Sequence, residues 1–255
     1  MEIYRVMNNI IALPKITVIT VTYNGEETLE NTITSVLNQT YKNIEYIIVD
    51  GESNDSTLEI IKKYDSIIWI SEKDKGIYDA MNKGVNLATG DFIIFLGADD
   101  VFLDFDVVNR VVALGLKKDA LNYGNVYFKC SSMIYFGKYK KSDLFHHNIC
   151  HQSIFYPTNF LKQHSYDLQY KVYADWELNI KAISVLDMNY LGIPITIFNE
   201  SGISSHVKDS FLKNRKKIIK EYFGILGLLT YFITNLRYVV RLVVKKIYYV
   251  TLIDK

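Results

Sequence analysis

Short apolar runs alternate with amphipathic segments along the first hundred residues of the chain. The runs are rich in β-branched residues and predict four strands, at about residues 15–22, 44–49, 67–70 and 91–96. Between the runs, apolar residues recur at helical spacing, as in Leu29, Ile33 and Val36. This alternation predicts right-handed βαβ units, and therefore an α/β fold with a mostly parallel, Rossmann-like central sheet flanked by helices.

Later in the chain the pattern is less regular. Residues 107–112 predict a helix, residues 121–129 and 133–139 predict two strands of a hairpin, and residues 173–186 predict an amphipathic helix. We expect residues 1–207 to form one domain with halves at about 15–102 and 103–207. Residues 208–255 then form a separate helical tail.

Polar or acidic residues follow three of the predicted strands. These residues are Tyr23-Asn24, Asp50-Gly51 and Asp99-Asp100. Ligands of an open α/β sheet bind outside the carboxyl ends of its strands, so we expect these residues to meet at one edge. Hard divalent cations prefer one or two carboxylates shared with phosphates, which makes Asp99 and Asp100 candidates for a metal–diphosphate site. The alternative is that both residues only cap the next helix.

Charge is unevenly distributed, although the whole chain of 255 residues has a formal net charge of only +1. Residues 208–255 contain 11 Lys and Arg and 3 Asp and Glu, a net charge of +8, which leaves −7 on the rest. The two cysteines, Cys130 and Cys150, provide no disulfide framework, and the first 14 residues lack the pattern of a signal peptide. We therefore expect a cytoplasmic protein.

The tail contains fifteen uncharged residues, Tyr222–Leu236, whereas a bilayer-spanning helix needs about twenty. Beyond them Arg237, Arg241 and Lys245 recur every fourth residue. This spacing favours an amphipathic helix that lies on an anionic membrane surface, at the inner face of the cell membrane. We expect no nucleic-acid partner. The alternative is a helix packed on the domain or on a second subunit of a homodimer.

Four segments together resemble the successive motifs of glycosyltransferase family 2. They are Val21–Leu29, Val49–Thr57, Ser71–Gly84 and Phe95–Asp100, and the similarity is closest to enzymes that build bacterial capsule, exopolysaccharide or lipopolysaccharide. The resemblance implies a GT-A fold, a nucleotide-diphospho-sugar donor that is usually linked to UDP, and Mn²⁺ or Mg²⁺ as cofactor. It assigns the donor to the half at 15–102 and the acceptor to the half at 103–207.

Residue by residue, the resemblance implies that the donor contacts Thr22, Tyr23, Glu26, Asp50, Asp74, Lys75, Gly76, Asp79 and Asp99. Asp99 would also hold the metal. Gly97 stands where many relatives have the first acid of an Asp-x-Asp motif, so a contact is missing there or is supplied by Asp100. His206 would complete the metal shell, or else is an exposed loop histidine.

On the acceptor side, the resemblance points to His151, Gln152 and Trp176 as contacts and to Asp175 as the general base. In the family an acid often precedes this base, and here Ala174 takes its place, so Asp175 is the first candidate and Glu177 the second. A plain N-cap for Asp175 and a structural role for His151 are the alternatives.

These observations predict an inverting, metal-dependent glycosyltransferase acting on a glycan or lipid-linked acceptor in bacterial surface polysaccharide synthesis. A non-catalytic nucleotide-sugar-binding module is the main alternative. A sugar nucleotidyltransferase would need a glycine-rich phosphate loop after the first strand, which this chain lacks.

Overall fold

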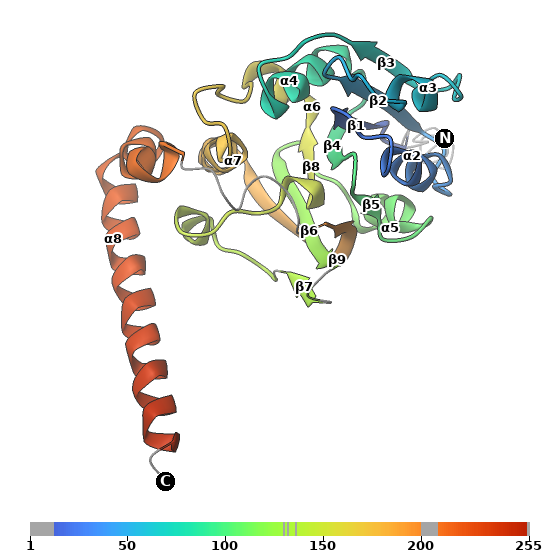
Figure 1. Ribbon diagram of the computed structural model, residues 1–255. Helices are drawn as coiled ribbons and strands as arrows, with labels where there is room; N and C mark the ends of the chain where they lie inside the picture. The colour runs from blue at the N-terminus through green and yellow to red at the C-terminus, as the bar shows by residue number, and fades with distance from the viewer. Residues whose placement is uncertain (1–12, 130, 132, 136, 200–208, 254–255) are drawn as a thin grey trace, which may run out of the picture.

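The computed structural model describes residues 13–129, 131, 133–135, 137–199 and 209–253. A central sheet is covered by helices on both faces (Figure 1). Its strands are β1 (Ile16–Thr22), β2 (Ile44–Asp50), β3 (Ile68–Ser71), β4 (Phe92–Gly97), β5 (Val101–Phe102), β6 (Ala120–Phe128), β7 (Met133–Tyr135), β8 (Ile154–Pro157) and β9 (Asp187–Phe198). The helices are α2 (Leu29–Leu37), α3 (Thr57–Ile61), α4 (Ile77–Leu87), α5 (Val107–Leu114), α6 (Thr158–Gln163), α7 (Ala174–Val185) and α8 (Phe211–Ile253), with short 3₁₀ turns η1 (Lys141–Phe145) and η2 (His151–Ser153).

The sheet confirms the predicted parallel first half. Its strand order is β3-β2-β1-β4-β8-β6-β9-β5, and β7 forms a hairpin with β6. Strand β1 pairs in parallel with β2 and β4, and β2 pairs in parallel with β3. Strand β8 is antiparallel to both β4 and β6, and it joins the parallel half to the mixed half.

Side chains of β1 alternate between two hydrophobic clusters, one on each face of the sheet. Val18 packs on the face covered by α2, α3 and α5, whereas Ile19 packs on the face covered by α4, α6 and α7. Both side chains are fully buried, and truncating a buried isoleucine such as Ile19 to alanine costs about 2–5 kcal/mol. Helix α4 can lie close to the sheet because residue 84 is a glycine. A Cβ at this position would lie only 2.6 Å from Ile19 Cγ2.

The sequence pattern did not predict β8 and β9. In β9 the apolar pattern is interrupted by Gly192, at φ 75°, and by Pro194. The pairing of β9 with β6 also shifts register around Asn125. Glycine and proline are turn signals in an isolated sequence, and here tertiary pairing with β6 overrides them.

Helix α8 starts as part of the body, bends and then extends beyond it. Phe211, Ile218 and Ile219 are buried in the same cluster as α7. At Gly224 the backbone is non-helical, with φ 64° and ψ −159°, and the long second part runs away from the sheet (Figure 1). No helix in the described part of the chain has both the length and the apolar character needed to cross a bilayer.

Candidate functional site

The three polar strand ends lie at one edge of the sheet, as the sequence predicted. In the registers of β1, Thr22 is opposite Asp50 of β2, and Val21 is opposite Gly97 of β4. Parallel pairing of neighbouring strands forces this alignment, because each strand delivers its carboxyl end to the same side. The loops that follow β1, β2 and β4 are therefore neighbours in space.

Asp50 is fully buried and orders two of these loops. Its Oδ2 accepts hydrogen bonds from the Ser53 backbone N–H at 3.1 Å and from the Ser71 hydroxyl at 2.6 Å, and the Ser53 hydroxyl donates to Oδ1. The carboxylate thus ties the β2–α3 loop to the end of β3. A direct contact of Asp50 with the donor stays a prediction.

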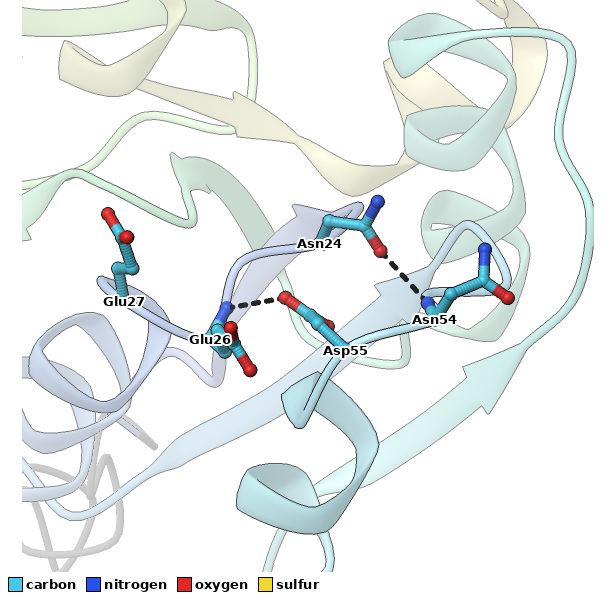
Figure 2. A pocket seen from close by; sticks show the side chains of 5 residues that line it. All are labelled: Asn24, Glu26, Glu27, Asn54 and Asp55. Carbon is cyan, nitrogen blue, oxygen red and sulfur yellow. Dashed lines mark hydrogen bonds between the residues drawn. The ribbon is translucent and has the colours of Figure 1, made fainter.

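The loop after β1 is joined to the loop after β2 through a set of reciprocal hydrogen bonds. Asn24 Oδ1 accepts from the Asn54 backbone N–H at 2.9 Å, and Asp55 Oδ2 accepts from the Glu26 backbone N–H at 3.1 Å (Figure 2). A hollow of about 340 Å³ lies between the two loops, lined by these four residues and Glu27. Of the predicted donor contacts, this hollow includes only Glu26.

A third loop, between β3 and α4, lies against the same edge. A Cβ on Gly51 would meet Asp74 Oδ2 at 2.6 Å, so the Asp74 carboxylate rests directly on the loop after β2. Asp74 Oδ1 accepts from the Gly76 backbone N–H at 2.8 Å, and Asp79 Oδ2 accepts from the Lys75 N–H at 2.9 Å. Gly76 has φ 121°, a conformation that side chains disfavour. These contacts place four predicted donor residues at the edge.

The two carboxylates after β4 differ in environment. Asp99 is exposed, with Asn199 Nδ2 donating to its Oδ2 at 3.3 Å. Asp100 is buried and accepts from Gln152 Nε2 at 3.1 Å and from the Asn199 backbone N–H at 3.1 Å. Burial and the neighbouring charge of Asp99 raise the pKa of Asp100 to about 6.

Gly97 makes room for the Asp100 side chain. A Cβ at position 97 would lie 2.8 Å from Asp100 Oδ2, which itself accepts a hydrogen bond from the Gly97 N–H at 3.2 Å. The carboxylate of Asp100 therefore lies in the space that a side chain at 97 would enter. This arrangement supports the hypothesis that Asp100 supplies the acid missing at position 97.

The donor set at this edge fits a divalent cation that also binds phosphate. Mg²⁺ is commonly held by one or two carboxylates together with substrate phosphates and water. Asp99 offers exposed oxygen atoms, and Asp100 lies beside it in the chain. The described residues contain no cluster of three or more ligating side chains, and His206, the third predicted ligand, lies outside them.

Asp175 is buried at the start of α7 and is held by side chains from distant segments. Its Oδ2 accepts from Asn148 Nδ2 at 2.8 Å and lies 3.3 Å from His151 Nδ1. Its Oδ1 accepts from the Trp176 backbone N–H at 2.8 Å, and the Tyr78 hydroxyl lies 3.2 Å away. The alternative of a plain N-cap is wrong, because Tyr173 holds the N-cap position and Asp175 is the second residue of α7.

The 3₁₀ turn η2 connects the two sets of carboxylates. His151 contacts Asp175, and the next residue, Gln152, donates to Asp100. Two consecutive residues therefore join the end of β4 to the start of α7. Gln152 is buried and donates to Asp100, so its side chain positions the Asp100 carboxylate. Contact of His151 or Gln152 with an acceptor stays untested.

Glu177 and Trp176 face other neighbours. Glu177 Oε1 accepts from the Tyr222 hydroxyl of α8 at 2.8 Å, and burial raises the pKa of Glu177. The Trp176 indole donates to the Leu144 carbonyl at 2.6 Å and packs on Phe211 of α8. Both side chains thus contact the interface between α7 and α8, so Asp175 is the better candidate for the base. The predicted acceptor contact of Trp176 remains untested.

Sequence reasoning missed two members of the Asp175 cluster, Asn148 and Tyr78. Asn148 is itself fixed, because its Oδ1 accepts from Asn179 Nδ2 at 2.9 Å, and Asn179 Oδ1 accepts from the Tyr156 hydroxyl at 2.7 Å. The signal for Asn148 was present in the polar stretch around residues 146–152. Tyr78 lies in the motif Ser71–Gly84, but it is 97 positions before Asp175, and no local pattern indicated that the two side chains meet.

Residues 17–171, more than half of the chain, match the family model described as Glycosyl transferase family 2. A PGL/p-HBAD biosynthesis glycosyltransferase of Mycobacterium bovis is 37% identical over 215 residues, covering 79% of this chain and 84% of that protein. The UDP-Glc:alpha-D-GlcNAc-diphosphoundecaprenol beta-1,3-glucosyltransferase WfaP of Escherichia coli is 35% identical over 117 residues, covering 45% of this chain and 47% of that protein. Among solved structures, S. aureus TarS 1-349 in complex with UDP-GlcNAc has a TM-score of 0.66 at 17% identity, covering 82% of this chain and 65% of that one.

Proposed function

Because this chain belongs to glycosyl transferase family 2 and has the predicted GT-A fold, we propose that it is an inverting, metal-dependent enzyme for bacterial surface glycan synthesis. Its donor would be a UDP-sugar, and its acceptor a lipid-linked or growing glycan. The names of two relatives support this proposal, since one acts in PGL biosynthesis and the other uses UDP-Glc and a diphosphoundecaprenol-linked acceptor.

One observation carries the assignment of the chemistry to this chain. The turn η2 joins the carboxylates after β4 to Asp175 through consecutive residues, His151 and Gln152. A transferase needs a group that holds the departing diphosphate near a group that takes the acceptor proton. In this proposal Asp99 and Asp100 would serve the first need and Asp175 the second, and the contacts through η2 support it.

On the donor side, the loops after β1, β2 and β3 would enclose the nucleotide. Tyr23 is exposed at the edge, and Asp74 and Gly76 form a tight turn opposite the loop that contains Gly51. Asp99 and Asp100 would hold Mn²⁺ or Mg²⁺, whose charge offsets the negative charge that develops on the departing diphosphate. Lys75, between Asp74 and Gly76 in the turn, is exposed and adds a positive charge to this loop.

On the acceptor side, Asp175 would take the proton of the attacking hydroxyl. The new bond forms between that oxygen and the anomeric carbon as the bond from this carbon to the diphosphate oxygen breaks, and the diphosphate leaves with the electron pair. Asn148 and His151 hold the Asp175 carboxylate in place while it acts as the base. A single base and a single displacement invert the anomeric centre.

The main competing function is a nucleotide-sugar-binding module without catalysis. Gly97 and Ala174 remove two acids that the family often has, which favours this alternative. The position of Asp100 beside Gly97 and the dense contacts of Asp175 favour the enzyme. A sugar nucleotidyltransferase finds no support, because the loop after β1 is Tyr23-Asn24-Gly25-Glu26 and not a glycine-rich phosphate loop.

The test is a panel of UDP-sugars and other nucleotide sugars with Mn²⁺ or Mg²⁺. We expect one donor to raise the melting temperature in a metal-dependent way, because a ligand that binds only the native state stabilises it. With that donor, UDP release should be seen with the wild-type protein and not with the Asp175→Asn variant. A protein that binds the donor but never releases UDP, with any acceptor extract, would be a binding module.

A further inference from the structure

The second part of α8 exposes a continuous apolar stripe. Six large side chains on it are 47% to 78% exposed: Ile225, Leu226, Leu229, Phe232, Ile233 and Leu236. At about 100° of rotation per residue they lie within an arc of about 120°, which is one face of the helix. Contiguous exposed apolar surface of this kind marks interaction sites, whereas single exposed apolar residues do not.

The stripe points away from the body because the opposite face of the helix is fixed to it. Tyr231 is buried and stacks on the His146 ring at a centroid distance of 4.8 Å. His146 Nε2 also lies 2.6 Å from the Thr234 hydroxyl. The Arg215 guanidinium lies 5.0 Å from the Trp176 ring and 5.6 Å from the Tyr231 ring, which clamps the two parts of α8 across the bend at Gly224.

One exposed lysine borders the stripe, and others lie on the adjoining first part of α8. The Lys216 ammonium lies 5.2 Å from the centroid of the Phe232 ring, so a positive charge is held next to an apolar member of the stripe. Lys213, Lys217 and Lys220 are exposed on the same first part of α8. Over residues 208–255 the net charge is +8, against −7 for the rest of the chain.

We propose that the stripe and these lysines form a docking surface for an anionic lipid bilayer. The helix lies in the plane of the interface, with the stripe among the acyl chains and the lysines against the headgroups. A lipid surface offers apolar and anionic partners at adjacent depths, which matches an apolar stripe with lysines nearby. Two copies meeting through this face would instead bring together segments that each have a net charge of +8.

The surface is distinct from the transfer site, and its test does not depend on activity. The full chain would be sedimented with vesicles of phosphatidylcholine alone and of phosphatidylcholine mixed with phosphatidylglycerol. We expect binding to the anionic vesicles to be at least about tenfold stronger, and to be released by high salt, because several lysines face the headgroups.

Two variants separate the apolar contribution from the electrostatic one. A triple change of the stripe, Leu226→Ser/Leu229→Ser/Ile233→Ser, should lower partitioning into anionic vesicles by more than about tenfold. Changing Lys213→Gln and Lys216→Gln should lower it by about fivefold per lysine and weaken its dependence on salt. All five positions are exposed, so thermal melting should confirm that the fold is retained.

A matched control is Leu114→Ser, which removes a similarly exposed apolar side chain from α5 and should leave vesicle binding unchanged. Equal binding to neutral and anionic vesicles, or binding to neither, would overturn the proposal. So would a dimer in solution that the stripe variant converts to a monomer while vesicle binding stays the same, because the stripe would then face a second copy.

Discussion

Replacing Asp175 with asparagine tests the proposed base while keeping the size of the side chain. In the structure both oxygens of Asp175 accept hydrogen bonds, one from Asn148 Nδ2 and the other from the Trp176 backbone N–H, each at 2.8 Å. An asparagine has one oxygen and one NH₂ group, so in either orientation one donor faces another donor. Asn148 resists turning over, because its own oxygen accepts from Asn179 at 2.9 Å.

Two effects of different size should follow from Asp175→Asn. Loss of a general base lowers a rate by about 10²- to 10⁴-fold, so we expect transfer to fall by at least about a hundredfold. The conflict between buried donors costs about 1–3 kcal/mol of unfolding free energy, which lowers the melting temperature by roughly 2–12 °C. Donor affinity should change little, because Asp175 lies on the acceptor side.

A second substitution separates these effects. In the double variant Asp175→Asn/Asn148→Asp, the carboxylate and the amide exchange places. The hydrogen bonds between positions 148 and 175 and between positions 148 and 179 then each have a donor and an acceptor again. We expect this variant to recover most of the lost stability and none of the lost rate. Glu177→Gln, on the same helix but facing Tyr222, is the control that should keep the rate.

The measurements are UDP release per folded molecule, donor affinity by calorimetry and thermal melting. A rate for Asp175→Asn above about a tenth of the wild-type rate would refute the base assignment. Recovery of the rate in the double variant would also refute it, because the reaction would then not need a carboxylate at position 175.

Three further predictions concern the metal, the donor loop and acid stability. Asp99→Ala should abolish metal-dependent UDP binding with little loss of stability, since the side chain is exposed; unchanged UDP affinity with Mn²⁺ would contradict the metal assignment. Gly51→Ala should push the Asp74 carboxylate, 2.6 Å from the new methyl group, out of place and raise KM for the donor more than it lowers kcat. Burial alone would raise the pKa of Glu45, but hydrogen bonds, first among them one from Lys15, lower it from 4.5 to about 2. A lowered pKa stabilises the fold above pH 4.5, and this contribution is lost as the pH falls towards 2. In urea denaturation, the stability gap between the wild-type protein and Glu45→Gln should therefore close over this range; a constant gap would show that Glu45 does not titrate as described.

The parallel half of the sheet could be predicted from local pattern alone. The runs that became β1, β2 and β4 are rich in β-branched and apolar residues because parallel strands are buried on both faces, and that requirement shows in the sequence itself. In the mixed half the prediction failed for β9, whose Gly192 and Pro194 read as a turn. That strand forms because β6 provides a long partner, and no local pattern encodes a partner more than sixty residues away.

The sequence by itself determined the family, the parallel core of the fold and the chemistry available after each strand, because these follow from residue types at short spacing. Only the tertiary structure decided which carboxylate of α7 shares a site with Asp100. Asp175 and Glu177 are two positions apart in sequence, yet one contacts Asn148 and His151 and the other contacts Tyr222 of α8. A helix turns by about 100° per residue, so side chains two apart point to different neighbours, and packing of distant segments fixes what those neighbours are.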